Sequence, residues 1–142
     1  MVILLTTFQE VYNYFLSKIT TYEFGELTQE ELDLELEQSL KSTIAKCVVL
    51  EKIELDTTLK EFSRDLSNLE MDIISYGMVV EYLTPKIYSI ELLKQSLNSS
   101  DYTMYSQANH LAQLLNTKKD ATYQFHYWMN RYGFLKKMGR DV

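Results

Sequence analysis

Residues that could carry acid–base, nucleophilic or metal chemistry are few in this sequence. The two histidines, His110 and His126, fall on one predicted helix. Their separation rotates them apart by about 160°, so they point to nearly opposite sides. Neither has a glutamate three residues before it, which is the spacing that di-metal helical bundles use. With one cysteine in the chain, a zinc site also lacks ligands. The sequence therefore predicts no metal and no cofactor.

One thiol and one acidic cluster are the remaining candidates for catalysis. Cys47 lies in an apolar run, and such surroundings raise a thiol pKa, so we expect a core cysteine. The acidic cluster could supply acid–base pairs, but without a pocket partner it is better explained as a solvated helix face: Glu30, Glu31, Asp33, Glu35 and Glu37. No phosphate-binding glycine loop or nucleophile elbow occurs. We predict that the chain is not an enzyme.

An aromatic segment is the strongest candidate for recognition. Residues 123–132 (YQFHYWMNRY) distribute their aromatic side chains around the whole helix circumference. A free surface helix does not normally expose so much aromatic area, and aromatics with Met and Arg are enriched in interface cores. We predict a partner-binding surface made of Tyr127, Trp128, Arg131, Tyr132, Phe134, Leu135, Lys136 and Lys137. Packing of both faces within one chain is the alternative. Stacking on single-stranded nucleic acid is a third, which the net charge of −6 disfavours.

The elements that position these residues are predicted to be helices. Only four glycines and one proline occur, which argues against an all-β fold. Three capping boxes mark helix starts, at Thr7–Glu10, Thr28–Glu31 and Ser67–Glu70. The predicted fold class is an all-α bundle of about five helices with a long C-terminal helix. The predicted helices span residues 8–19, 29–49, 68–83, 89–97 and 102–132.

The boundaries between these helices follow from local rules. Pro85 is predicted to end the third helix, because the residue before a proline is biased out of helical geometry. A polar turn at residues 98–101 precedes the long helix, residues 116–120 could kink it, and Gly133 is predicted to end it. Residues 51–66 are predicted as a loop with at most a short helix.

Two helices carry the main packing information. The third is apolar nearly all round, so we expect it to be the central one, and Gly77 within it indicates a close helix crossing. The long helix is predicted to carry one apolar face, made of Met104, Ala108, Leu111, Leu115, Thr122, Phe125, Met129 and Tyr132. At about 45 Å it exceeds the roughly 37 Å span of a compact chain of this length. It must project, bend or pack against another chain.

Charge is distributed unevenly along the sequence. Residues 23–37 contain acidic but no basic side chains, and residues 118–142 are mainly basic. This polarity favours a contact between identical subunits, acidic region against basic tail. The alternative is a solvated acidic face and an ordinary basic C-terminus. The Val2–Leu5 run is too short for a signal peptide, and no apolar stretch approaches the roughly 18–20 residues that span a bilayer. We therefore expect synthesis in the cytoplasm and no membrane contact.

Three stretches carry a family resemblance: residues 7–19 (TFQEVYNYFLSKI), 78–97 (MVVEYLTPKIYSIELLKQSL) and 101–111 (DYTMYSQANHL). The chain resembles small proteins encoded in the structural-gene clusters of tailed phages and prophages of Gram-positive bacteria, the head-to-tail connector (adaptor or neck) proteins. The resemblance covers most of residues 7–115. The last part of the chain and the apolar leader are less typical.

The chain length predicts a single helical domain over residues 1–142, and the basic, aromatic C-terminus predicts that residues 133–142 are a tail for partner contact. The family resemblance adds an expected assembly. It implies a dodecameric ring beneath the portal protein, bound on its other side by a stopper or tail-completion protein. In such a ring DNA would pass through the lumen without sequence-specific binding, and an acidic lining such as Glu30, Glu31, Glu35 and Glu37 would keep it from adhering. The location would be the virion neck, assembled in the host cytoplasm. The competing prediction is a cytoplasmic helical interaction or regulatory module acting as a small homo-oligomer.

Overall fold

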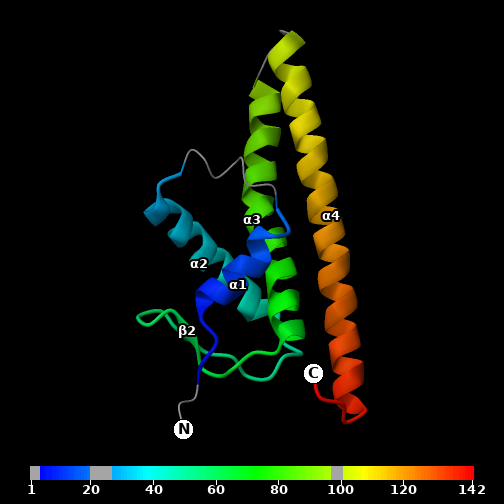
Figure 1. The fold of residues 1–142 in the computed structure, drawn as a ribbon. Helices are drawn as coiled ribbons and strands as arrows, with labels where there is room; N and C mark the ends of the chain where they lie inside the picture. The colour runs from blue at the N-terminus through cyan, green and yellow to red at the C-terminus, as the bar shows by residue number, and fades with distance from the viewer. Residues whose placement is uncertain (1–3, 20–26, 97–100) are drawn as a thin grey trace.

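The computed structural model describes residues 4–19, 27–96 and 101–142, and the side chains among them outside 90–108. Within these ranges the chain is mostly helical, as predicted, with four helices rather than five and one small hairpin. The elements are α1 (Phe8–Leu16), α2 (Gln29–Lys46), β1 (Leu55–Asp56), β2 (Glu61–Phe62), α3 (Asn68–Ser96) and α4 (Asp101–Lys137). Antiparallel α3 and α4 form a long pair, while α1, the start of α2 and the hairpin lie across α3 from α4 (Figure 1).

Helix starts agree with the predicted capping boxes. At Thr7 both reciprocal bonds form, since Thr7 Oγ1 accepts from the N–H of Glu10 and Glu10 accepts from the N–H of Thr7. The box at Ser67 is also complete. At Thr28 the hydroxyl accepts from the N–H of Glu31 at 3.1 Å, which is the first half of a box. Each cap contributes about 1 kcal/mol by satisfying backbone donors that the first turn leaves free.

Helix α3 is the central element, as its nearly continuous apolar sequence predicts. Helices α1, α2 and α4 all pack against it. Its buried side chains include Met71, Ile73, Ile74, Met78, Val79, Tyr82, Leu83 and Ile87. The predicted ends at residue 83 and at Pro85 are wrong, because α3 runs through the proline. A proline inside a helix costs about 3 kcal/mol. Leu83 and Ile87 are both buried on either side of it, and this packing outweighs the local rule.

Gly77 is the close crossing point that the sequence indicates. A Cβ atom there would lie 2.4 Å from Thr43 Cγ2 on α2 and 2.8 Å from Phe125 Cε2 on α4. Both distances are shorter than any ordinary van der Waals contact. Glycine therefore lets two helices approach α3 at one level, and this offsets its unfavourable helix propensity.

Gly77→Ala is expected to lower the free energy of unfolding by roughly 1–2 kcal/mol, because overpacking outweighs the better helix propensity of alanine. Thr43→Ser removes the clashing methyl group and keeps the hydroxyl that donates to Ser39 O. In that background the loss should be smaller. Urea denaturation of the four chains of this cycle measures the coupling. Gly133→Ala is the matched control, since its Cβ would meet only Val49 Cγ1, at 3.1 Å. Equal effects at both glycines would contradict the crossing.

Residues 51–66 contain a hairpin that the sequence did not reveal. Leu55 pairs with Phe62 and Asp56 with Glu61 in antiparallel register. The turn is held by the Asp56 carboxylate, which accepts from the N–H groups of two following residues, and Lys60 adopts a positive φ of 56°. Phe62 is fully buried against the ring of Phe8. Strands of two residues carry no alternation, and a lysine is an uncommon residue for left-handed geometry.

Helix α4 is longer than predicted. It continues unbroken through residues 116–120 and through Gly133, so neither the kink nor the stop at Gly133 occurs. The helix ends instead at Lys137, and two residues later Gly139 adopts a φ of +74°. The N–H of Arg140 donates to Leu135 O and that of Gly139 to Lys136 O, each at 3.0 Å, which is a Schellman cap. The first part of the predicted tail is therefore the last turn of α4.

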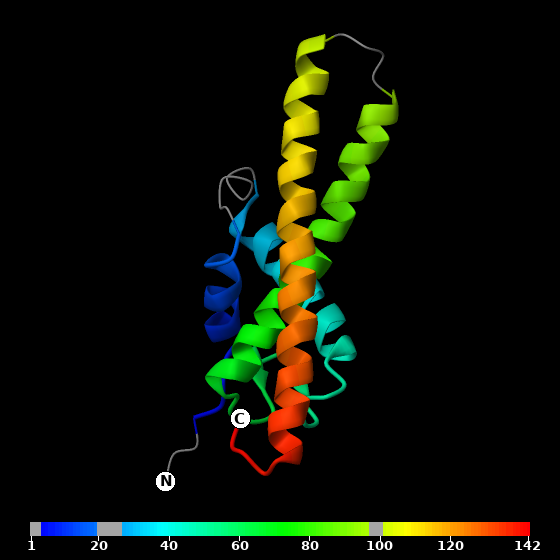
Figure 2. The same ribbon diagram turned by 90° about the vertical axis from the view of Figure 1, so that its right-hand side faces the viewer.

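The α3–α4 pair extends beyond the rest of the molecule. The end of α3 and the start of α4 lie past α1, α2 and the hairpin (Figure 2). With 37 residues, α4 is about 55 Å long. The chain exposes 9357 Å² of surface, whereas a compact monomer of its mass exposes about 7,600 Å². The predicted turn at residues 98–100 lies outside the described residues.

Candidate assembly surface

The side of α4 that faces away from α3 carries an apolar stripe. Tyr123, Tyr127, Phe134 and Met138 are 63%, 47%, 55% and 57% exposed. Their spacing of four, seven and four residues keeps them on one side of the helix and its C-cap. The opposite side is buried and contains Leu111, Leu114, Ala121, Phe125, Met129 and Tyr132. We call the exposed set the outer α4 stripe. The prediction that Leu115 belongs to the buried side is wrong, because Leu115 is 42% exposed and its neighbour Leu114 is buried instead.

The rings of the stripe are already ordered. Tyr123 and Tyr127 stack with centroids 6.1 Å apart and planes 19° from parallel. Tyr127 meets Trp128 edge-on at 5.1 Å. Trp128 is half-buried against the core, and its Nε1–H donates to Gln124 Oε1 at 3.1 Å. A partner would therefore lose little side-chain entropy when it orders these rings further.

The predicted partner-binding residues separate into two groups. Tyr127 and Phe134 belong to the outer α4 stripe, with exposed Arg131 and Lys137 beside them. Trp128, Leu135 and Lys136 are half-buried, and Tyr132 is 1% exposed in the core of the single chain. Tyr132 is thus occupied internally and is omitted from the surface proposed below. Tyr123 and Met138 belong to the surface although the predicted set lacks them, and helical periodicity is the signal that would add them.

Tyr132 and Lys136 are part of a polar network that joins the two ends of the long helices. Glu70 is 4% exposed at the start of α3. It accepts hydrogen bonds from Arg64 at 3.0 and 2.5 Å, from the N–H of Ser67 at 3.0 Å and from the Tyr132 hydroxyl at 3.1 Å. Lys136 Nζ donates to Tyr132 Oη at 3.3 Å and pairs with Glu51 at 2.5 Å.

The protonation of Glu70 follows from two opposed causes. Burial by itself raises the pKa of this carboxyl, but the hydrogen bonds from Arg64, Ser67 and Tyr132 outweigh burial, so its pKa is lowered overall. The ionised form is the one that these donors hold. The network therefore anchors the C-terminal end of α4 to α3, directly beneath the outer α4 stripe.

The four acidic residues proposed for a lumen do not form one solvated surface. Glu30 and Glu31 are exposed in the first turn of α2. Glu35 lies 3.6 Å from Lys86, and Glu37 accepts both of its bonds from Lys60, at 3.0 and 3.1 Å. Only the first two offer unpaired charge to solvent.

The residues first considered for chemistry are not assembled into a site. Cys47 is 6% exposed, as expected for a core cysteine, and burial raises its pKa to about 12. Nowhere in the described ranges do three or more His, Cys, Asp or Glu side chains gather in a metal-binding arrangement. No helix among the described residues is both long and apolar enough to cross a membrane.

Comparisons of the chain with protein-family models, with curated proteins and with solved structures find no match. The fold and the outer α4 stripe together define a helical protein with an aromatic surface that its own chain leaves uncovered.

Proposed function

We propose that this chain is a structural virion protein, a head-to-tail connector subunit that assembles with copies of itself into a ring. The outer α4 stripe is the observation that carries the proposal. A helix already buried on one side has a second apolar side with ordered rings and flanking cations. Contiguous apolar surface of this kind marks protein–protein contact in soluble proteins.

The excess surface of the chain supports assembly. The chain exposes 9357 Å², which is about 1,700 Å² more than a compact monomer of this mass. A standard interface buries about 800 Å² on each partner. An elongated subunit with more exposed surface than a compact monomer can offer area to a neighbour on each side, as a ring requires.

The arrangement of the surfaces favours a directional contact. The outer α4 stripe with its cations lies on one side of α3, and the acidic start of α2 lies on the other (Figures 1 and 2). Two different surfaces on one subunit make a head-to-tail contact, which closes into a ring or extends into a filament. A connector requires the closed form, with a lumen for DNA. The projecting end of the α3–α4 pair then supplies a second platform, for a portal or for a stopper or tail-completion protein.

The biological test uses the gene in its genomic setting. Portal and capsid genes are expected beside it. Deleting the gene from the phage or prophage should yield separate heads and tails in electron micrographs of lysates, and a plasmid copy should restore tailed particles. Normal tailed virions from the deletion strain would overturn the connector role. A symmetric dimer in solution together with normal virions would instead support the cytoplasmic interaction module.

A further inference from the structure

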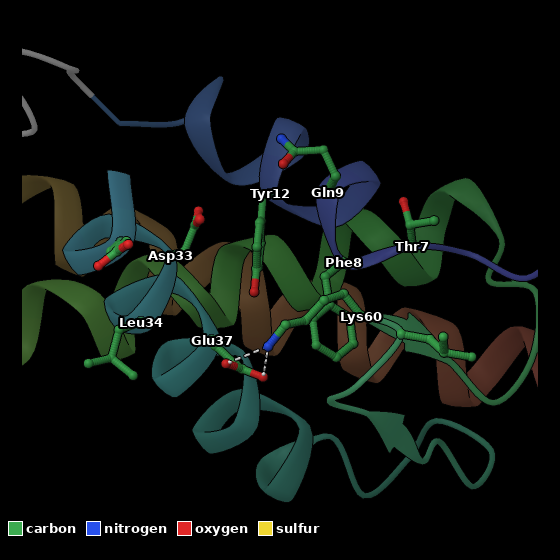
Figure 3. A pocket seen from close by; sticks show the side chains of 10 residues that line it. Thr7, Phe8, Gln9, Tyr12, Asp33, Leu34, Glu37 and Lys60 are labelled. Carbon is green, nitrogen blue, oxygen red and sulfur yellow. Dashed lines mark hydrogen bonds and ion pairs between the residues drawn. The ribbon is translucent and has the colours of Figure 1, made fainter. Parts of the chain in front are cut away.

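A second surface feature lies across α3 from the outer α4 stripe. It is a cleft of about 550 Å³ between α1, the start of α2 and the hairpin, shown in Figure 3. Its lining comes from three separate segments of sequence: Thr7, Phe8, Gln9, Tyr12, Glu30, Asp33, Leu34, Glu37, Leu59 and Lys60. We call it the acidic cleft. Its volume is within the range of sites that bind side chains and small ligands.

The charges in the acidic cleft are unbalanced. Lys60 is the one basic residue of its lining, and it is bound to Glu37 by two contacts. Asp33 accepts from the amide of Gln29 at 2.9 Å but, like Glu30, forms no ion pair with any residue in the described part of the chain. Two carboxylates are therefore left to attract a cation from outside the subunit.

Tyr12 gives the cleft a polar group, since its ring is buried while its hydroxyl stays open to the cleft. Its side chain is 7% exposed and extends from α1 toward Glu37 and Lys60 (Figure 3). The hydroxyl forms no hydrogen bond with any residue in the ranges that the structure covers. Burial, followed by the charges of Glu37 and Asp33, raises the pKa of Tyr12, so the hydroxyl stays neutral. A neutral hydroxyl that faces the cleft can donate a hydrogen bond to an occupant or accept one from it.

The lining of the cleft also contains exposed apolar side chains. Leu34 is 57% exposed and Leu59 is 65% exposed, and the buried ring of Phe8 belongs to the same lining. The occupant should therefore combine an apolar or aromatic anchor with a nearby cation. On this chain the end of α4 has that composition, since Phe134 and Met138 are exposed next to Arg131 and Lys137.

We propose that the acidic cleft receives the C-terminal end of α4 from a second copy of this chain. Phe134 and Met138 of one copy pack on Leu34 and Leu59 of the next, and Arg131 and Lys137 face Glu30 and Asp33. The subunit's own helix end lies across α3 from the cleft (Figures 1 and 2), so a neighbour must supply it. This inference rests on the proposed self-assembly and names its two contacting surfaces. The ionic contacts add to the apolar contacts of the half-exposed stripe and help to offset the entropy lost on association.

Charge reversal with rescue tests the pairing. Glu30→Lys with Asp33→Lys, and separately Arg131→Glu with Lys137→Glu, should each weaken self-association at least tenfold in sedimentation velocity. An equimolar mixture of the two reversed chains should associate again. The matched control reverses exposed charges outside both surfaces, Glu54→Lys in one chain and Lys52→Glu in the other. These variants should associate like the wild type, alone or mixed. Circular dichroism monitors folding of every variant.

Disulfide trapping tests the same contact between full-length chains, and it detects self-association that is too weak for sedimentation velocity. Since Cys47 is buried with a raised pKa, it stays inert, and an introduced exposed cysteine reacts selectively. A chain with Leu34→Cys and a differently tagged chain with Met138→Cys should form a mixed disulfide. Replacing the first by Tyr88→Cys, which is 63% exposed on α3, should reduce the yield at least tenfold.

The outcomes separate this inference from the proposed function. If substitution of the outer α4 stripe abolishes assembly, while cleft reversal has no effect and no rescue occurs, self-assembly stands and the cleft assignment is overturned. If cleft reversal abolishes binding to a portal protein but leaves self-association unchanged, the occupant is not a second copy. If the chain stays monomeric at every concentration and no mixed disulfide forms, both proposals fail.

Discussion

Replacing Tyr127 and Phe134 together with serine is expected to abolish self-association while helix content and melting temperature stay the same. Both side chains are about half exposed, so their loss should change the free energy of unfolding by no more than about 0.5 kcal/mol each. Aromatic residues at the centre of an interface contribute 2 kcal/mol or more when truncated. Loss of both should therefore weaken association about a thousandfold.

Sedimentation velocity over a concentration series measures this effect directly. The control is Tyr88→Ser with Leu115→Ser, which removes similar exposed apolar area (63% and 42% exposed) outside the outer α4 stripe. The control chain should associate like the wild type. Unchanged association of the stripe variant would contradict assembly through α4, and its failure to fold would assign both residues to the core. Trp128 is a poor choice for this test, because its ring packs on the core.

The parts of the fold that were predictable are those that local sequence determines. The capping boxes at Thr7 and Ser67 form because both partners of each box lie within one turn. Helix α3 is central because its sequence leaves no wide polar face. The helix crossing at Gly77 was predictable because only glycine, which has no Cβ atom, allows so close an approach. The helix ends predicted at Pro85 and Gly133 do not occur. The helix-breaking preference of each residue costs a few kcal/mol at most, and the packing of the flanking side chains contributes more than that to stability.

The candidate surfaces were predictable only in part. Helical periodicity places Phe125, Met129 and Tyr132 on the buried side of α4 and the outer α4 stripe on the opposite side. The predicted partner surface was based on the number of aromatic residues and not on this periodicity. It therefore included Tyr132, which belongs to the buried side. The acidic cleft is of another kind. Tyr12, Asp33 and Lys60 meet there from three segments through tertiary packing, and no spacing in the sequence connects them.

The second large effect is expected at Glu70. Glu70→Ala should lower the free energy of unfolding by about 3 kcal/mol, because it leaves Arg64 and the Tyr132 hydroxyl without their shared acceptor. Glu70→Gln should cost less, since the amide oxygen still accepts one bond. Glu54→Ala is the control, because Glu54 pairs with Lys52 in an exposed contact that contributes little. Urea denaturation at neutral pH compares the three variants with the wild type.

The pH dependence of these differences identifies the charge as the cause. Since folding lowers the pKa of Glu70, its contribution is complete above the ordinary carboxyl value of about 4.5 and is lost as pH falls through the folded-state value. The stability gap between wild type and Glu70→Gln should therefore be constant from pH 7 to pH 5 and shrink below that. A gap that persists unchanged at pH 3 would mean that shape, and not charge, gives Glu70 its role. Because the same carboxylate holds Tyr132 at the base of the outer α4 stripe, acid should also loosen that end of α4 before the core unfolds.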